Sequence, residues 1–251
     1  MSKSLSKNFI ERFSRQIILK NIGVLGQKKL YSSKVLVVGL GGLGCPVVDY
    51  LSRAGVGFIG IVDNDIVSLS NLHRQSLYNY SDIGNPKVDI VKQKLNLINN
   101  FTSVKTYNLR LNKNNIKEIA KNYSYIVDGS DNFATKFLLN DFALKNKKTL
   151  ITGAISKFDG HVFSFNFKKK RLPCLRCFYQ EKIISDDLLN CESEGILGTA
   201  AGLTGILQAN EVLKKILDIR GNIDGFILII DMIKMNFRRA KIKKRKGCIC
   251  K

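Results

Sequence analysis

The sequence predicts an α/β fold: a Rossmann-like, mostly parallel sheet with helices on both faces and a C-terminal antiparallel extension. Up to residue 154, apolar runs of strand length alternate with segments of helical periodicity, which is typical of a covered parallel sheet. After residue 154 a period of two replaces this pattern and favours antiparallel strands. The 251 residues have the length of one ordinary domain, so we expect residues 1–251 to form a single domain.

The segments before residue 155 account for the parallel part of the sheet. Phe9, Phe13 and Ile17 lie four residues apart and indicate an amphipathic helix over 8–20. The run KVLVVG at 34–39 is apolar throughout, as a strand buried on both faces would be. We expect further strands at 58–63, 103–109, 125–132 (running into a loop) and 149–154, and helices from about Leu43 and over 87–99, 112–121 and 132–146.

The segments after residue 154 have a different character. HVFSFNF at 161–167 alternates by two, as an antiparallel strand does. A cysteine-bearing loop at 172–195 and a Gly/Ala-rich helix over about 198–217 follow. FILIID at 226–231 and MNFRRAKI at 235–242 complete the sheet, and residues 234–251 form a basic C-terminal tail.

Composition excludes several classes of protein. Hydrophobic residues make up 45% of the chain, enough for a core, so we do not expect global disorder. No apolar run reaches the length of a membrane span, and the N-terminus lacks the features of a signal peptide. We therefore expect a cytoplasmic protein without a membrane partner, whose six cysteines are thiols or metal ligands before they are disulfides.

The formal net charge is +21, which would attract nucleic acid or an acidic protein. The abundance of Lys, Asn and Ile equally fits the coding bias of an AT-rich genome, so the origin of the charge stays open. The tail 234–251 carries nine Lys or Arg and no acid, but no RNA-binding motif accompanies it. We favour a tail that steers an acidic protein partner, and we do not expect nucleic acid as a partner.

A nucleotide-binding turn is the strongest single feature of the sequence. Gly39, Gly41 and Gly44 form G-x-G-x-x-G, with Gly42 inside the same turn, between a predicted strand and a predicted helix. Glycines there let backbone N–H groups approach phosphate oxygens at a helix N-terminus, although such a turn can also serve only to pack helix on strand. Asp63 ends the next strand, where a carboxylate would bind ribose hydroxyls, and Asp65 ranks below it.

Charged and polar groups follow this turn in an order that a dehydrogenase does not need. Cations near a phosphate ester stabilise its cleavage, and a carboxylate at the end of another strand suits Mg²⁺ shared with phosphates. The cations are Arg74 and Lys87, and the carboxylate is Asp131. Polar neighbours at the same predicted edge are Ser70, Asn71 and Asn132.

Five segments resemble the HesA/MoeB/ThiF family, the bacterial relatives of ubiquitin-activating enzymes. The resemblance runs from about residue 8 to the C-terminus, and its SLSNLxRQ and DN motifs are specific to the family. The segments are RFSRQIIL at 12–19, VVGLGGLGCP at 37–46, AGVGFIGIVDNDIVSLSNLHRQ at 54–75, IGNPKV at 83–88 and VDGSDNFATK at 127–136.

The resemblance implies that residues 1–251 are one adenylation domain that uses ATP and Mg²⁺. Such a domain adenylates the C-terminal glycine of a ubiquitin-like sulfur-carrier protein ending in Gly-Gly. Asp63 would then hold the ribose, Asp131 would position Mg²⁺, and the phosphates would be contacted by Asn71, Arg74 and Lys87.

The resemblance further implies a homodimer. Arg15, in the FSRQ segment, matches an arginine that the family donates across the dimer interface to the ATP of the partner. An ordinary charge on a helix surface is the alternative reading of Arg15.

Two pairs of cysteines suggest a structural zinc ion. Cys174 and Cys177 form C-x2-C, and Cys248 and Cys250 lie at the end of the chain. The family uses two C-x2-C pairs, whereas the second pair here is one residue short, so reduced free thiols stay as the alternative. Cys191 matches a position where some relatives carry a cysteine that links covalently to the carrier, and others keep it without needing it.

Several questions stay open from the sequence. The carrier can belong to molybdopterin or to thiamine-thiazole biosynthesis. Without a rhodanese-like extension, a separate sulfurtransferase or cysteine desulfurase would deliver the sulfur. The rival hypotheses are a family member that adenylates tRNA or a peptide, and an NAD(P)-dependent oxidoreductase.

Overall fold

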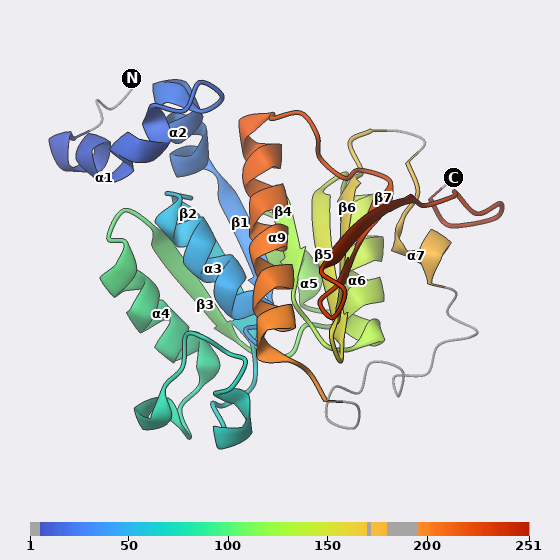
Figure 1. The fold of residues 1–251 in the computed structure, drawn as a ribbon, viewed down its shortest axis with the longest axis horizontal. Coiled ribbons are helices and arrows are strands. Elements are labelled where there is room, and N and C mark those ends of the chain that lie inside the picture. The colour runs from blue at the N-terminus through green and yellow to red at the C-terminus, as the bar shows by residue number, and fades with distance from the viewer. Residues whose placement is uncertain (1–5, 170–171, 180–194, 251) are drawn as a thin grey trace.

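A computed structural model describes residues 6–169, 172–179 and 195–250. One eight-stranded sheet runs through the molecule in the order β3-β2-β1-β4-β5-β6-β7-β8 (Figure 1). The first five strands pair in parallel, and the last three continue the sheet in antiparallel pairs. The strands are β1 Lys34–Val38, β2 Phe58–Asp63, β3 Ser103–Asn108, β4 Tyr125–Asp128, β5 Thr149–Ser156, β6 Asp159–Asn166, β7 Phe226–Asp231 and β8 Asn236–Lys241.

Helices cover both faces of the sheet, as predicted. The helices α3 (Gly44–Arg53), α4 (Lys87–Ile98) and α9 (Gly198–Leu217) lie on one face and share one hydrophobic core with it (Figure 1). On the opposite face, α5 (Ile116–Ala120) and α6 (Phe133–Lys145) enclose a second core, and α7 (Leu175–Phe178) packs against α6. The predicted fold class is therefore confirmed, including the change to antiparallel strands after β5.

The N-terminus forms two helices where the sequence predicted one. Helix α1 (Lys7–Ile17) ends three residues earlier than expected, and α2 (Gly23–Ser32) was not predicted. Two glycines and weak amphipathic periodicity hide α2 in the sequence. Its position is decided by tertiary packing, because its buried residues face α1 and α9. Phe9 and Phe13 of α1 anchor the pair through ring contacts with Phe101.

Most other boundaries agree with the prediction to within two residues, and one helix is clearly shorter. Helix α5 begins at Ile116 although 112–121 was predicted. The side chain of Asn112 accepts hydrogen bonds from the backbone N–H groups of Asn114 and Asn115, and Asn115 accepts one from the N–H of Asn112. These local bonds compete with helical hydrogen bonds, so the helix starts only after them.

The connection between β2 and α4 carries two short 3-10 helices, Leu69–Asn71 and Tyr80–Asp82. None of the described helices is both long enough and apolar enough to cross a membrane. The β1 and β4 strands are neighbours although β2 and β3 follow β1 in the chain. The connections after β1 and β4 therefore lead away in opposite directions, and ligands of open α/β sheets bind in the crevice between them.

Candidate active site

The glycine turn after β1 is shaped by contacts that tolerate no side chain. Gly39 has a φ of +88°, and a Cβ there would lie 2.7 Å from the carbonyl oxygen of Gly129. A Cβ on Gly44 would collide with the carbonyl of Gly39. Gly41, by contrast, faces open space apart from the amide of Gln75, so a ligand can approach its backbone. The turn therefore holds the β1 and β4 loops together and leaves one side free.

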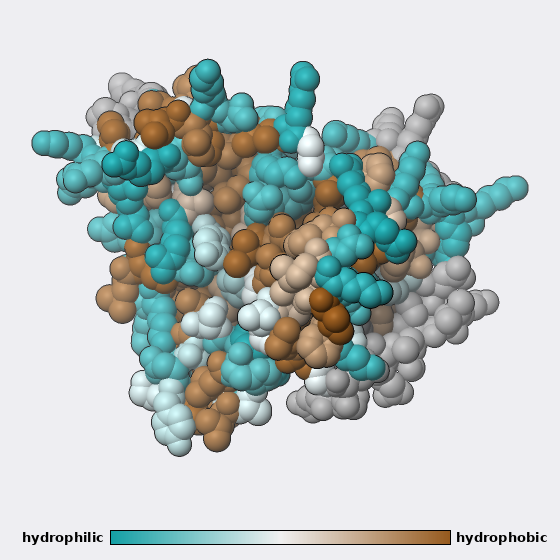
Figure 2. Space-filling view, in the orientation of Figure 1, coloured by the Kyte–Doolittle hydropathy of each residue, from teal (hydrophilic) through white to brown (hydrophobic). Residues whose placement is uncertain are grey.

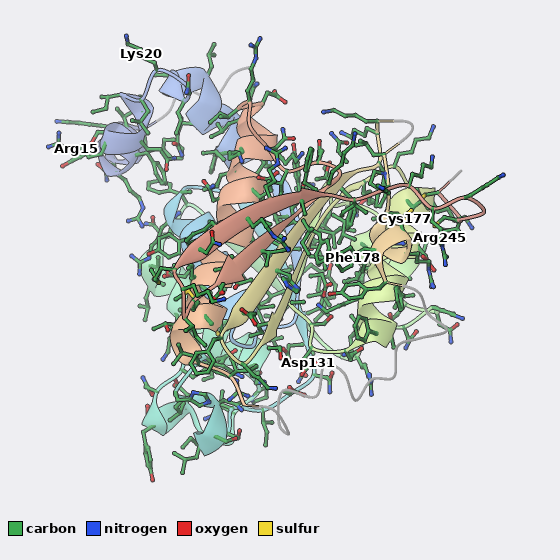
Figure 3. All side chains as sticks on the ribbon, turned by 45° about the vertical axis from the view of Figure 1, so that its right-hand side comes forward. Arg15, Lys20, Asp131, Cys177, Phe178 and Arg245 are labelled. Carbon is green, nitrogen blue, oxygen red and sulfur yellow. The ribbon has the colours of Figure 1, made fainter. Side chains whose placement is uncertain are left out.

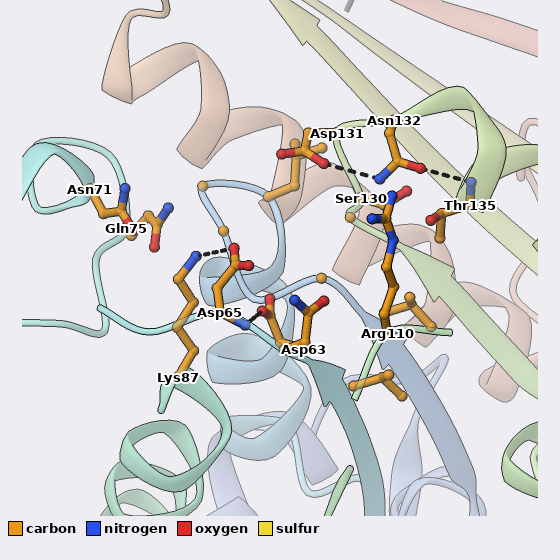
Figure 4. Close-up of a pocket in the computed structure, with 18 of the residues that line it drawn as sticks. Asp63, Asp65, Asn71, Gln75, Lys87, Arg110, Ser130, Asp131, Asn132 and Thr135 are labelled. Atoms are coloured by element: carbon orange, nitrogen blue, oxygen red, sulfur yellow. Dashed lines mark hydrogen bonds and ion pairs between the residues drawn. The ribbon is translucent and has the colours of Figure 1, made fainter. Parts of the chain in front are cut away.

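That free side opens into a cavity of about 580 Å³ at the carboxyl ends of the parallel strands. Most of the residues predicted from the sequence line it, and Figure 4 shows their side chains converging on it. Gly44 is not among the lining residues, because it begins α3 behind the turn. The predicted residues that do line the cavity are Gly39, Gly41, Gly42, Asp63, Ser70, Asn71, Arg74, Lys87, Asp131 and Asn132.

Asp63 lies at the end of β2, as predicted, and its carboxylate is held by the backbone. One oxygen accepts a hydrogen bond from the N–H of Leu40 at 2.6 Å, and the other from the N–H of Asp65 at 2.8 Å. Burial raises the pKa of Asp63, while Lys87 and these N–H groups oppose that effect. Each carboxylate oxygen keeps a second lone pair, so hydroxyl donors of a bound ribose could still be accepted.

Two cations face the cavity from the segment beyond β2. Lys87, at the start of α4, is only 5% exposed, and its ammonium lies 2.9 Å from Asp65. Arg74 donates hydrogen bonds to the carbonyl of Ser70 and to Nε2 of His73, both at 2.8 Å. The Lys87 ammonium thus lies in a largely desolvated place, where an anion is attracted more strongly than in bulk water.

Asp131 and Asn132 approach the cavity from the loop after β4. The amide of Asn132 donates a hydrogen bond to Asp131 at 3.2 Å, and its oxygen accepts one from the N–H of Thr135 at 2.8 Å. Asn132 is therefore the N-cap of α6 and at the same time a neighbour of Asp131. The Asp131 carboxylate itself is exposed, with lone pairs available to a cation.

Four further residues line or support the cavity and were not among the predicted site residues. Gln75 is 4% exposed, and its Oε1 has no hydrogen-bond partner in the described part of the chain, which suits a cavity made for a polar ligand. Arg110 extends from the end of β3 towards Ser130 and Asn132 (Figure 4). Lys136 lines the cavity and forms a buried ion pair with Asp128, which does not line it. Gln75, Asp128 and Lys136 lie within the family-like segments 54–75 and 127–136, but nothing in those segments assigned them a role at the site, and Arg110 lies in no motif.

Two predicted site residues are not found at the cavity: one lies on another part of the surface, and the other lies outside the described residues. Arg15 is exposed on α1 and does not line the cavity of its own chain, and Figure 3 shows it far from Asp131. Cys191 lies outside the described residues.

The four cysteines predicted as metal ligands come together from distant parts of the chain. Their sulfur atoms all lie within 4.8 Å of one another, with Cys174–Cys248 at 3.6 Å and Cys177–Cys250 at 3.4 Å. A tetrahedral zinc ion with Zn–S bonds near 2.3 Å requires its sulfur ligands to be about 3.8 Å apart. The cluster therefore fits zinc, and the short C-x-C spacer does not prevent all four thiols from meeting.

Cys45 stands apart from this cluster. It is fully buried at the start of α3, and burial raises the pKa of its thiol to about 12. Such a thiol is unreactive, so Cys45 acts as a small packing residue.

The sequence profile of the ThiF family matches residues 13–250, and the chain belongs to this family. It is 43% identical over 243 residues to the "Adenylyltransferase and sulfurtransferase MOCS3" of Culex quinquefasciatus, covering 97% of this chain and 55% of that protein. It is 38% identical over 246 residues to the "Sulfur carrier protein adenylyltransferase" of Thermus thermophilus, covering 97% and 91%. The chain thus spans about half the length of its MOCS3 relatives.

Solved structures share the fold at lower identity. A crystal structure of E. coli MccB superposes with a TM-score of 0.82 at 21% identity, covering 95% of this chain and 74% of that one. A crystal structure of PaaA gives 0.82 at 21% identity, with 97% and 86% covered.

The close contact at Gly39 leads to a test of the turn. We expect Gly39→Ala to destabilise the protein more than Gly84→Ala, although both glycines have φ near +85°. Gly84 has open space around its Cβ position, so its substitution adds only the backbone strain of about 1–2 kcal/mol. Gly39→Ala adds a collision with the Gly129 carbonyl. Urea unfolding of both variants measures the difference, and equal losses would contradict the role assigned to this contact.

Proposed function

We propose that this chain is an ATP-dependent adenylyltransferase that activates the C-terminal glycine of a ubiquitin-like sulfur-carrier protein. The observation that carries the proposal is the gathering of Arg74, Lys87 and Asp131 around one cavity beside the glycine turn. The names of two relatives support the proposal. The Culex protein is named as an adenylyltransferase and sulfurtransferase, and the Thermus protein is named as a sulfur carrier protein adenylyltransferase. The carrier belongs to molybdopterin or thiamine-thiazole biosynthesis, and assays with each candidate carrier would decide between the two.

The chemistry brings two anions together. A carboxylate oxygen of the carrier attacks the α-phosphorus of ATP, a new O–P bond forms, and the bond to pyrophosphate breaks with its electron pair leaving on pyrophosphate. Lys87 and Arg74 reduce the repulsion between the reactants and stabilise the charge that develops on the phosphate oxygens. Asp63 orients the ribose, and the glycine turn lets the nucleotide lie against the backbone.

Asp131 is the residue that we propose to hold Mg²⁺. Its exposed carboxylate offers hard oxygen ligands at the rim of the cavity, as Mg²⁺ prefers. The metal, when bound, would neutralise phosphate charge next to the two cations.

Carrier-dependent exchange of pyrophosphate into ATP tests this function. We expect Asp131→Ala to abolish the exchange, because the metal loses its protein ligand. We expect Lys87→Ala to cost about 2–4 kcal/mol of transition-state stabilisation, the scale of losing one preorganised donor. Lys94→Ala is the matched control, since Lys94 lies on the same helix and in an ion pair with Asp82 but does not line the cavity. Near-normal exchange by the Asp131 variant would remove Asp131 from the mechanism.

We also propose a homodimer in which Arg15 reaches the cavity of the partner. The helices α1 and α2 and the segment between them expose apolar side chains near Arg15 in the sequence, and Figure 2 shows apolar surface at the upper left. The exposed apolar residues are Ile10, Ile18, Leu19, Val24 and Leu25. A surface of this kind favours association with a second copy, which would also place Arg15 near a nucleotide.

Mixing two inactive variants tests this arrangement. If Arg15 acts on the partner, a mixed dimer of Arg15→Ala and Asp131→Ala carries both defects at one site and leaves its other site intact. After subunit exchange, about a quarter of all sites would then be intact and exchange activity would return. If Arg15 acts within its own chain, no site is restored, and a mixture that stays inactive despite proven exchange would refute the proposal.

We further propose that the four-cysteine cluster binds structural zinc. It would tie α7 to the end of the chain, so Cys248→Ser should release the metal and lower the melting temperature. Elemental analysis of the purified protein should find about one zinc per chain, and none in the Cys248 variant. Cys45→Ala is the control, because Cys45 lies apart from the cluster and should leave the zinc content unchanged. A native protein with much less zinc than this would show that the thiols are free.

A further inference from the structure

A buried ion pair lies at the wall of the cavity, where Lys136 is one of the lining residues, and the function proposed above does not use it. Asp128, the last residue of β4, is 0% exposed, and Lys136, on α6, is 1% exposed. The ammonium of Lys136 lies 3.2 Å from Asp128 and donates a hydrogen bond to the carbonyl of Gly153 at 2.6 Å. The pair therefore joins β4, α6 and β5 at the place where the loop 129–132 begins.

The other bonds of Asp128 run to the same loop and to neighbouring elements. One carboxylate oxygen accepts hydrogen bonds from the backbone N–H and the hydroxyl of Ser130, at 3.0 and 2.5 Å. The second oxygen accepts from Thr152 at 2.9 Å, and the backbone carbonyl accepts from Gln208 at 2.8 Å. Asp128 is thus the centre of a network that includes the residue directly before Asp131.

Stability alone is a poor explanation for such a pair. Removing two charges from water costs several kcal/mol, which the attraction between them recovers only with good geometry and full hydrogen bonding. An apolar pair could fill the same space without that cost. What this pair supplies is a fixed orientation of its hydrogen-bond partners, because hydrogen bonds to a carboxylate or from an ammonium have preferred geometries.

This fixed orientation extends to the backbone around Asp131. The amide of Asn132 donates to its carboxylate, and Asn132 is in turn held by its role as the N-cap of α6. On the other side of Asp131, Ser130 is held by Asp128, and Gly129 donates to the carbonyl of Val38 at 2.8 Å. The backbone of the loop is therefore restrained on both sides of Asp131.

We infer that Lys136 and Asp128 are positioning residues that hold the loop 129–132 so that Asp131 presents its carboxylate to the metal of a bound Mg·ATP. This inference rests on the proposed function and adds to it two residues that act on the metal through the loop and not as its ligands. Lys136 also neutralises Asp128, so Asp131 is the carboxylate of this loop that offers net negative charge to a cation.

The test measures how much Mg²⁺ the protein requires. We expect Lys136→Met to raise the Mg²⁺ concentration for half-maximal carrier-dependent exchange by about tenfold or more, since a hydrogen bond to a charged group is lost. Lys136→Arg keeps the charge and should recover most of the affinity. Ser130→Ala removes the hydroxyl bond to Asp128, keeps the backbone N–H bond and leaves no buried charge unpaired. It is the second variant if Lys136→Met fails to fold, and it should raise the Mg²⁺ requirement several-fold.

Lys215→Met is the matched control for loss of a buried ion pair. Lys215 is buried on α9 beside Asp224 and Glu211 and does not line the cavity. It lies about 21 Å along the helix from Ala201, which touches the glycine turn. We expect Lys215→Met to lower the melting temperature but to leave the Mg²⁺ requirement unchanged. If Lys136→Met and Ser130→Ala also lose only stability, the pair is structural and the inference is wrong.

Binding measurements separate this inference from the proposed function. Titration of each variant with ATP at several Mg²⁺ concentrations reports metal positioning without any carrier. The proposed function would be refuted if the wild-type protein binds Mg·ATP but none of the candidate carriers supports pyrophosphate exchange. In that case the shift in Mg²⁺ dependence of ATP binding between the Lys136 and Lys215 variants would still decide the inference.

Discussion

The close approach of two backbone turns, at Gly39 after β1 and at Gly129 after β4, is the constraint on which the site depends. Any side chain at Gly39 would meet the Gly129 carbonyl, so the two loops touch through backbone alone. This contact closes the floor of the cavity and leaves its mouth to the residues beyond β2 and β4. A nucleotide bound there would have the glycine turn on one side and Asp131 on the other.

Charge is distributed over the site in two layers. Lys87 and Arg74 line the cavity, and Lys87 reaches it from a desolvated position beside an exposed partner, Asp65. Asp128 and Lys136 are almost completely buried and pair with one another, and only Lys136 of the two reaches the cavity wall. The outer layer can exchange its partners for phosphate oxygens, whereas the inner layer has all its bonds within the protein. Lys87 and Arg74 are therefore suited to binding a ligand, and Asp128 and Lys136 are suited to fixing the geometry of the loop after β4.

The hydrophobic cores on the two faces of the sheet support different sites. The core under α3, α4 and α9 supports the glycine turn, because α9 packs on α3 where the turn ends. The core under α5 and α6 includes Cys174, Cys248 and Cys250, so it continues directly into the four-cysteine cluster. That cluster brings together residues more than seventy positions apart, and the zinc ion proposed above would hold residues 248–250 beside α7.

Local patterns in the sequence were enough for the fold class, the glycine turn, Asp63 and most of the cavity rim. They sufficed because strand and helix periods are local, and because parallel strands bring their carboxyl ends to one edge. The helix α2 and the network around Asp128 and Lys136 emerged only from the folded chain, and only the folded chain shows that the short C-x-C spacer lets the four predicted thiols meet. Each of these depends on contacts between segments that are distant in sequence, which a local period cannot encode.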